Sequence, residues 1–313
     1  MPVIAKLLTS ALIAFSLLLP GVSQASGPAT PLLWRLNTGG STVYLLGSFH
    51  MLRADDYPLA SEIDLAFADA ERVVFEVHPA ELASAAAMQQ ALRHARLSPA
   101  AQAVARLPDN AAATLAALLA ERGVPAAQLA GYQPWFTSAR LVMDASRGLG
   151  FSHELGLDKH LMARAAAAGK AVAGLESLDA QLQALGAAPL QEQLGTLAAL
   201  VAAPHAMADG VARLHEAWRS GDAERLDRDS RAALAASAPG TYRAINVERN
   251  RAWLPAIQSM LDRPAGEDVL VVVGAMHLLG RDGLVSMLHE RGLVAHRVGG
   301  DRAPALAAGY TAR

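Results

Sequence analysis

Two histidines, His50 and His277, end the same short motif near opposite ends of the chain. Each Gly-x-x-His motif, at 47–50 and 274–277, directly follows a run of apolar residues. Such a run predicts a buried strand, and a glycine at its end lets the backbone turn sharply. Ligands of parallel α/β sheets bind beyond the carboxyl ends of the strands. If the two strands are neighbours, both imidazoles will lie at one edge of the sheet.

A carboxylate accompanies the two histidines, because Glu76 lies near the end of the apolar run 72–77. Two neutral imidazoles and one carboxylate can hold a catalytic divalent ion and leave positions open for water. Such an ion lowers the pKa of bound water and makes hydroxide available near neutral pH. We therefore predict His50, Glu76 and His277 as metal ligands and catalytic residues. Reserve ligands or bases are His78, His153, Glu154 and Asp158.

The absence of cysteine narrows the chemistry further. Thiolate ligands, thiol nucleophiles and disulfides are excluded, and a shell of nitrogen and oxygen suits Zn, Mn, Co or Fe. The segment 153–157 begins like a zincin motif, but Leu157 stands where the second histidine is required. No Gly-x-Ser-x-Gly nucleophile elbow is present. His205 and His215 fall in a helical region, and we expect them to be structural or exposed.

The elements that must position these residues alternate between strand and helix at both ends of the chain. An Asn and Gly cluster at 37–40 separates two apolar runs, which predicts a β-hairpin. Gly292 stands where a helix C-terminal cap is expected. The pattern predicts strands at 33–36, 42–46, 72–77, 268–273 and 293–298, and helices at 59–70 and 281–291.

The middle of the chain is rich in Ala and Leu at helical spacing, with one candidate strand at 170–175. We therefore predict an α/β fold with a small parallel or mixed central sheet and a large helical insert or cap. The expected single domain spans 26–313. Its α/β core comes from 26–80 and 252–313, and its mainly helical insert is 81–251.

The N-terminus has the pattern of a secretory signal. Lys6 precedes the apolar run 7–22, and the small residues of 23–25 predict cleavage after Ala25. An uncleaved anchor is the alternative. No second apolar run reaches membrane-spanning length without a charge or a breaker, so we expect no membrane span after cleavage. The expected location is periplasmic or secreted.

The net charge bears on partners. Lys and Arg number 27 against 29 Asp and Glu, and no basic stripe carries interleaved aromatic residues. Such a chain offers no field that attracts a polyanion, so we expect no nucleic acid partner. The expected partner is a peptide or small-molecule substrate.

The two Gly-x-x-His motifs, with Glu76 on the strand after the first, resemble the TraB/PrgY/GumN family, which includes the Tiki metalloproteases. The resemblance extends over nearly all of 26–313, and includes segments 156–158 and 174–176 and the pair Arg249 and Asn250. It implies that the two histidines and the glutamate are metal or catalytic residues. It also implies that Arg249 and Asn250, in a predicted helix over 242–261, shape the site and offer charge or a donor to an oxyanion.

Three functions remain open from the sequence. The first is a metal-dependent hydrolase, with peptides as the leading substrate class because the family includes metalloproteases. The second is a metal-independent hydrolase in which a His and Glu pair activates water, as the likeness of the family to erythromycin-esterase-like proteins implies. The third is a non-catalytic periplasmic binding or accessory protein, linked to exported polysaccharide or a signalling peptide.

Overall fold

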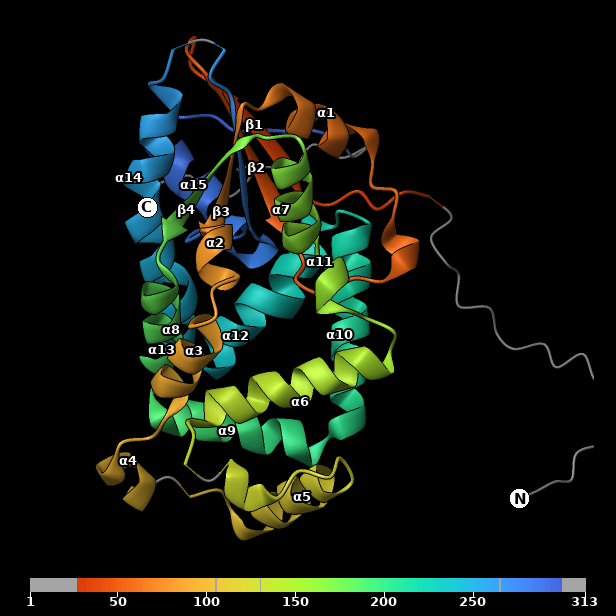
Figure 1. The fold of residues 1–313 in the computed structure, drawn as a ribbon, viewed down its shortest axis with the longest axis vertical. Coiled ribbons are helices and arrows are strands. Elements are labelled where there is room, and N and C mark those ends of the chain that lie inside the picture. Colours follow the sequence, from red (N-terminus) through yellow and green to blue (C-terminus); the bar gives the residue numbers. More distant parts are fainter. Residues whose placement is uncertain (1–26, 105, 130, 265, 300–313) are drawn as a thin grey trace, which may run out of the picture.

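The computed structural model describes residues 27–104, 106–129, 131–264 and 266–299. The predicted signal, residues 1–25, lies outside the described residues. Six strands form one mixed sheet (Figure 1). They are β1 (Leu33–Asn37), β2 (Thr42–Ser48), β3 (Arg72–Val77), β4 (Ala171–Glu176), β5 (Val269–Gly274) and β6 (His296–Arg297).

The strand order is β4-β3-β5-β2-β1-β6. The four strands from β4 to β2 are parallel, whereas β1 and β6 pair antiparallel at one edge. The predicted hairpin is confirmed as β1 and β2. The strands that precede the two histidines are direct neighbours, because Gly47 pairs with Val273 and Ser48 with Gly274. The sheet therefore delivers both Gly-x-x-His motifs to the same edge.

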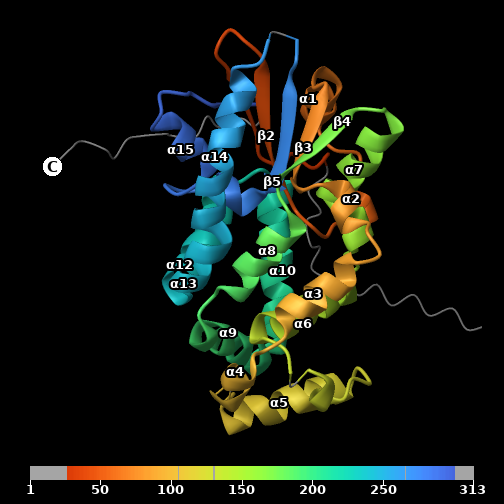
Figure 2. The same ribbon diagram turned by 60° about the vertical axis from the view of Figure 1, so that its left-hand side comes forward.

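Helices cover both faces of the sheet. Figure 2 shows α14 and α15 on one face and α1 and α7 on the other. Leu45 of β2 and Val271 of β5 are fully buried, as continuous apolar central strands require. These four helices are α1 (Ser61–Asp69), α7 (Leu157–Ala167), α14 (Glu248–Leu261) and α15 (Leu284–His289).

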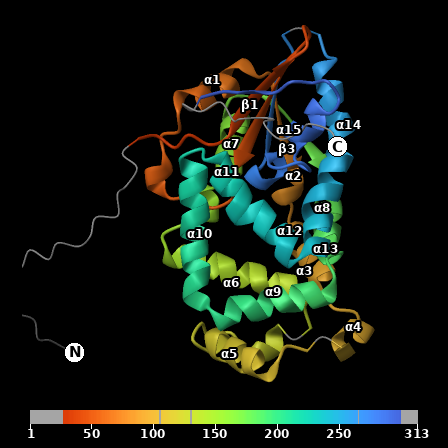
Figure 3. The ribbon, with the colours of Figure 1, turned by 180° about the vertical axis from the view of Figure 1, so that it is seen from behind.

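The other helices gather beyond the carboxyl ends of the parallel strands, where α6 and α9 cross below the sheet (Figures 1 and 3). They have a separate apolar cluster that includes Leu119, Leu141 and Val201. Their bounds are α2 (Pro79–Leu82), α3 (Ala87–Ala95), α4 (Pro99–Val104), α5 (Asp109–Ala120), α6 (Pro134–Gly148), α8 (Leu178–Gly186), α9 (Leu190–Ala202), α10 (Pro204–Arg219), α11 (Ala223–Leu226), α12 (Ala233–Ser237) and α13 (Pro239–Tyr242).

Three elements differ in detail from the sequence patterns. The candidate strand in the middle of the chain is β4, so the predicted insert supplies one edge strand of the sheet. The strand predicted at 293–298 shortens to the two residues of β6. A π-helical segment, Arg243–Val247, precedes α14 within the helix predicted at 242–261.

No single helix among the described residues has the length and apolarity that crossing a membrane requires. The consecutive helices α9 and α10 meet that test only as a pair, and the chain bends by 101° between them.

Candidate active site

His50, Glu76 and His277 surround one point at the carboxyl edge of the sheet, where β5 ends at Gly274. A Cβ atom placed on this glycine would lie 3.3 Å from Oε1 of Glu76 and 3.7 Å from Nε2 of His50. It would lie 3.6 Å from Cδ2 of His277. The glycine therefore leaves the space in which the three side chains approach one another.

Backbone contacts hold the His50 loop in place. Phe49 accepts a hydrogen bond of 3.1 Å through its carbonyl oxygen from the N–H of Leu157, the first residue of α7. Gly156 packs directly on the loop, because a Cβ atom there would lie only 2.3 Å from the carbonyl oxygen of His50. The indole N–H of Trp218, on α10, donates to the carbonyl oxygen of Gly47 at 2.9 Å. The start of α7 and Trp218 together therefore hold the backbone of the His50 loop in place.

The ring nitrogen of His50 that points away from Glu76 contacts a carboxylate. Its Nδ1 lies 3.2 Å from Oδ1 of Asp158, in the first turn of α7. The imidazole is 58% exposed and Asp158 is 16% exposed, so the ring opens onto solvent-filled space while its partner is largely covered. The charge of Asp158 raises the pKa of His50 to about 9. The pair leaves Nε2 facing Glu76 and Gly274.

Glu76 accepts hydrogen bonds from donors on three elements. Its Oε1 accepts from the N–H of Gly274 at 2.7 Å. Its Oε2 accepts from Arg249, on α14, at 2.6 Å and from Gln181, on α8, at 3.0 Å. Burial alone would raise the pKa of Glu76, but the charge of Arg249, the two nearby histidines and the hydrogen bond from Gly274 together outweigh it and hold the pKa at about 2. Glu76 is therefore a carboxylate throughout the physiological range.

His277 is the buried member of the group, at 4% exposure. Its Nδ1 lies 2.7 Å from Oδ1 of Asn250, and its Nε2 lies 3.1 Å from Nη1 of Arg249. Since a guanidinium only donates, Nε2 is the acceptor of that contact. Burial lowers the pKa of His277 to about 3, so the ring is neutral. Nε2 also lies 3.9 Å from Oε1 of Glu76.

Arg249 contacts Glu76, His277 and Glu176, the buried residues of the site. It donates to Glu76 and His277 as above, to the carbonyl oxygen of Ile245 at 3.1 Å, and to Glu176, at the end of β4, through both Nε and Nη2 at 3.0 and 2.6 Å. These contacts engage all five N–H groups of the guanidinium. The amide nitrogen of Asn250 likewise donates to the carbonyl oxygens of His277 and Asp282. Both residues therefore orient the site and have no donor left for an oxyanion.

Three residues at the site were not predicted from the sequence. They are Gln181, Glu176 and Trp253, whose indole N–H donates to Glu176 at 3.2 Å and whose ring lies 4.6 Å from that of His277. Glu176 ends a strand as Glu76 nearly does, so the same pattern could have indicated it. Gln181 lies on a helix of the predicted insert, and no local signal marks it.

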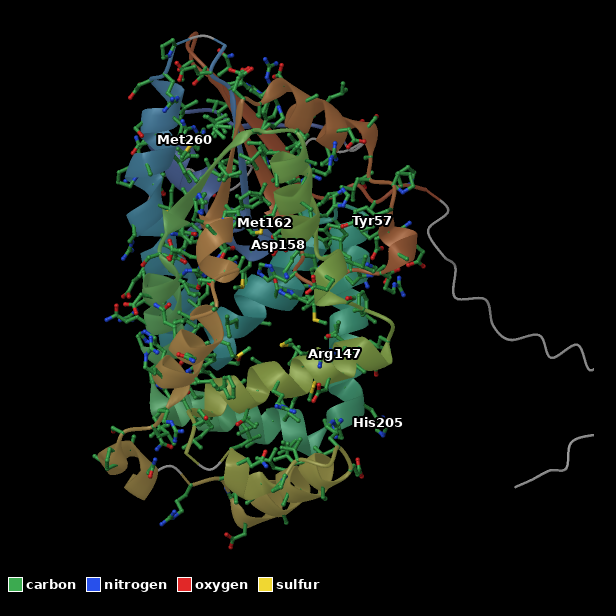
Figure 4. All side chains as sticks on the ribbon, in the orientation of Figure 1. Tyr57, Arg147, Asp158, Met162, His205 and Met260 are labelled. Carbon is green, nitrogen blue, oxygen red and sulfur yellow. The ribbon has the colours of Figure 1, made fainter. Side chains whose placement is uncertain are left out.

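The remaining candidates lie around the site without meeting in it. His78 caps α2 by accepting from the N–H of Ala80. His153 contacts the carbonyl oxygen of His50 at 3.2 Å, whereas Glu154 is exposed and pairs with Lys159. His215 is buried, with Nε2 2.9 Å from Oδ1 of Asp56, and His205 is exposed. Figure 4 shows Asp158 and Met162 near the middle of the molecule and His205 far below them on α10.

Two hollows meet at the site. The first, of about 670 Å³, includes Met51, Leu82, Met143 and Met162. The second, of about 590 Å³, includes Val142, Leu185, Leu214 and Ile245. Both are lined by Ser48, His50, Met51, Glu76 and Gln181. The site therefore lies at the boundary between two largely apolar spaces.

Comparison with known protein families identifies the family of the chain. Residues 32–297 match the TraB/PrgY/gumN family, and this range includes every residue described at the site. The chain belongs to the TraB/PrgY/gumN family. Comparison with curated proteins gave no match, and neither did comparison with solved structures. The likeness of this TraB/PrgY/gumN protein to Tiki metalloproteases stays a prediction.

The predicted metal shell of this TraB/PrgY/gumN protein conflicts with Arg249. No three His, Asp or Glu side chains within the described ranges are arranged to hold an ion. A cation bound by both His277 and Glu76 would have to displace the guanidinium that already contacts Nε2 of the one and Oε2 of the other. As placed, the three residues do not fit a shared ion. The metal requirement stays a prediction.

Proposed function

We propose that this chain is a hydrolase that activates water with His50, without a metal ion, and attacks a carbonyl group of an ester or amide. The observation that carries the proposal is the contact of His50 with Asp158. It uses Nδ1 and leaves Nε2 directed to the junction of the two hollows, beside Glu76. A histidine held in this way by a carboxylate is suited to act as a general base.

The proposed reaction uses water as the nucleophile. Neutral His50 takes a proton from water through Nε2, and the hydroxide adds to the carbonyl carbon to form a tetrahedral intermediate. The imidazolium then returns the proton to the leaving oxygen or nitrogen as the carbon–heteroatom bond breaks. Oε1 of Glu76 has a lone pair beyond its bond to Gly274 and accepts the second hydrogen of the water.

A direct attack by a side chain has less support. The sequence contains no cysteine. The hydroxyl of Ser48 lines the site but has no hydrogen-bond partner among the described side chains, so no base is in place to activate it. Water is the reactant that the arrangement favours.

A hydrolysis assay tests the proposal. Purified protein is incubated with p-nitrophenyl acetate and with a pool of quenched fluorescent peptides. Wild type is expected to turn over members of at least one class, and His50→Ala is expected to lose at least 100-fold in kcat/KM. His205→Ala removes an exposed histidine remote from the site and is the matched control. Equal rates for wild type and His50→Ala would defeat the proposal, as would the absence of turnover by wild type, which would leave a binding role.

We propose that the hydrolase acts outside the cytoplasm. Support comes from Lys6, the apolar run 7–22 and the small residues that precede position 26. N-terminal sequencing of protein recovered from the periplasm or medium is expected to begin at Ser26. Protein that stays in the cytoplasm with Met1 retained would contradict this location.

A further inference from the structure

A third hollow lies beside α14 and α15, the two helices that cover one face of the sheet (Figure 2). Its volume is about 440 Å³, and it shares no lining residue with the two hollows at the active site. Arg251 lines it from α14, only two residues after Arg249. Residues two apart on a helix do not face the same side. The hollow is therefore separate from the space in which hydrolysis is proposed.

Three arginines on three different segments converge on this hollow. Arg251 belongs to α14, Arg281 to the loop after the second Gly-x-x-His motif, and Arg291 to the turn that follows α15. Guanidinium groups repel one another, so three of them around one hollow are unfavourable without negative charge between them. Phosphate and carboxylate groups are the anions whose geometry the guanidinium matches.

Two carboxylates, Asp282 and Glu290, also line the hollow but leave positive charge in excess. Oδ2 of Asp282 lies 3.5 Å from Nε of Arg281 and compensates that guanidinium. Among the described residues, neither Arg251 nor Arg291 forms an ion pair with a carboxylate. An anion in the hollow would give these two guanidiniums the partner that the surrounding side chains do not supply.

The wall of this hollow is joined to the active site through the backbone of Asp282. The amide nitrogen of Asn250 donates to the carbonyl oxygen of Asp282 at 2.7 Å and to that of His277 at 3.2 Å. The amide oxygen of Asn250 lies 2.7 Å from Nδ1 of His277. Arg281 is 83% exposed, so its side chain is free to turn toward an anion. A shift of 281–283 would therefore change the contacts that hold His277.

We infer that this hollow binds a small anion that carries phosphate or carboxylate groups, with the three arginines as its ligands. The bound anion acts on His277 through Asp282 and Asn250. The near-neutral charge of the whole chain does not conflict with this site, because the hollow gathers positive charge locally. Its volume is that of a small-molecule site.

Calorimetric titration of the purified protein with pyrophosphate and with citrate tests the site. Both titrations are run at one ionic strength, set with KCl, because salt screens loose attraction between surface charges. We expect saturable binding of one anion per chain for at least one of the two probes. Tighter binding of pyrophosphate would assign a phosphate ligand, and tighter binding of citrate a carboxylate ligand. If neither probe binds saturably, the inference is wrong.

Substitutions with opposite effects on the charge locate the bound anion. Arg251→Ala and Arg291→Ala each remove a guanidinium and are expected to raise the Kd by about tenfold or more. Glu290→Gln removes a carboxylate that repels the anion, so it should lower the Kd by about threefold. Arg213→Ala is the matched control, since Arg213 is exposed like Arg251 but lines none of the three hollows.

The three test variants can also contradict the site. If Arg251→Ala and Arg291→Ala bind the probe as tightly as wild type, or if Arg213→Ala weakens binding as much as they do, the anion is held elsewhere. If Glu290→Gln weakens binding, the carboxylate does not face the anion. Each of these results would overturn the inference.

NMR of histidine-labelled protein tests the link to the active site. Saturation with the bound probe is expected to shift the ¹H–¹⁵N signals of the His277 ring. The signals of His205, which is exposed and remote, should stay unchanged (Figure 4). Unchanged His277 signals at saturation would overturn the link. Neither titration nor NMR measures hydrolysis, so the anion site can fail while hydrolysis by His50 stands, and the reverse is equally possible.

Discussion

Nδ1 of His277 lies 2.7 Å from Oδ1 of Asn250, and this contact decides which ring nitrogen carries the proton. The Asn250 amide nitrogen already donates to two carbonyl oxygens, so its oxygen must accept. His277 therefore donates through Nδ1 and accepts from Arg249 through Nε2. The guanidinium is thereby directed onto Glu76.

The protonation of His277 can be observed directly. Because burial holds its pKa at about 3, the ring is expected to stay neutral from pH 8 to pH 5, with its proton on Nδ1. Two-dimensional ¹H–¹⁵N NMR of histidine-labelled protein distinguishes the two tautomers and the imidazolium. Asn250→Ala is expected to weaken the preference for this tautomer. An imidazolium signal from His277 at pH 6 in wild type would contradict the account.

The rate of hydrolysis is expected to rise with pH. Only neutral His50 can take a proton, and Asp158 raises its pKa to about 9. Below that pKa, kcat/KM should increase about tenfold per pH unit, and it should level off above it. Asp158→Asn removes the main cause of the shift, so the midpoint should move to lower pH. Glu76, Arg249 and His153 also face His50 and remain in this variant. If the midpoint of the pH profile is the same in Asp158→Asn as in wild type, Asp158 does not set the pKa of His50.

Arg249 is expected to be a large contributor to stability. Arg249→Gln leaves Glu76 and Glu176 buried without their shared cation, and burial already raises the pKa of Glu176. Loss of one partner from such a group costs about 3–5 kcal/mol. Urea unfolding measures the change. The double variant Arg249→Gln/Glu176→Gln removes one excess carboxylate and should be less destabilised than the single one. Equal losses would show that the charges act independently.

Two glycine substitutions should act in opposite directions. Gly156→Ala forces a Cβ atom to 2.3 Å from the His50 carbonyl oxygen, so the loop must move. We expect a loss of about 1–3 kcal/mol and a lower kcat/KM. Gly195→Ala, within α9, meets no atom within 4 Å and should stabilise by about 0.5–1 kcal/mol. Thermal or urea unfolding compares them, and similar effects would mean that residue 156 does not support His50.

Local patterns were sufficient to predict the sheet's central strands. Apolar runs at 42–46, 72–77 and 268–273 predicted β2, β3 and β5 because strands buried on both faces need continuous apolar residues. The short β6 was overestimated. Only His296 and Arg297 pair with β1 at this edge of the sheet.

The site was less accessible to sequence reasoning. His50 and His277 could be predicted because a glycine after an apolar run marks the end of a strand, and this pattern is local in the sequence. The contacts of Arg249 depend on how α14 packs beside β4, and those of Gln181 on where α8 lies beyond the sheet edge. Neither the packing of α14 nor the position of α8 can be predicted from a local sequence pattern. The sequence therefore indicated His50, Glu76 and His277, but it did not indicate the guanidinium that links Glu76 to His277.

Hydrolysis after metal removal tests the central claim most directly. Wild type is dialysed against a chelator, its residual metal is measured by mass spectrometry, and its kcat/KM is compared with untreated protein and with His50→Ala on the best substrate. The account predicts full wild-type activity at less than about one tenth of an ion per chain, and loss of activity only in His50→Ala. Activity that disappears with the metal and returns on addition of Zn, Mn, Co or Fe would contradict it.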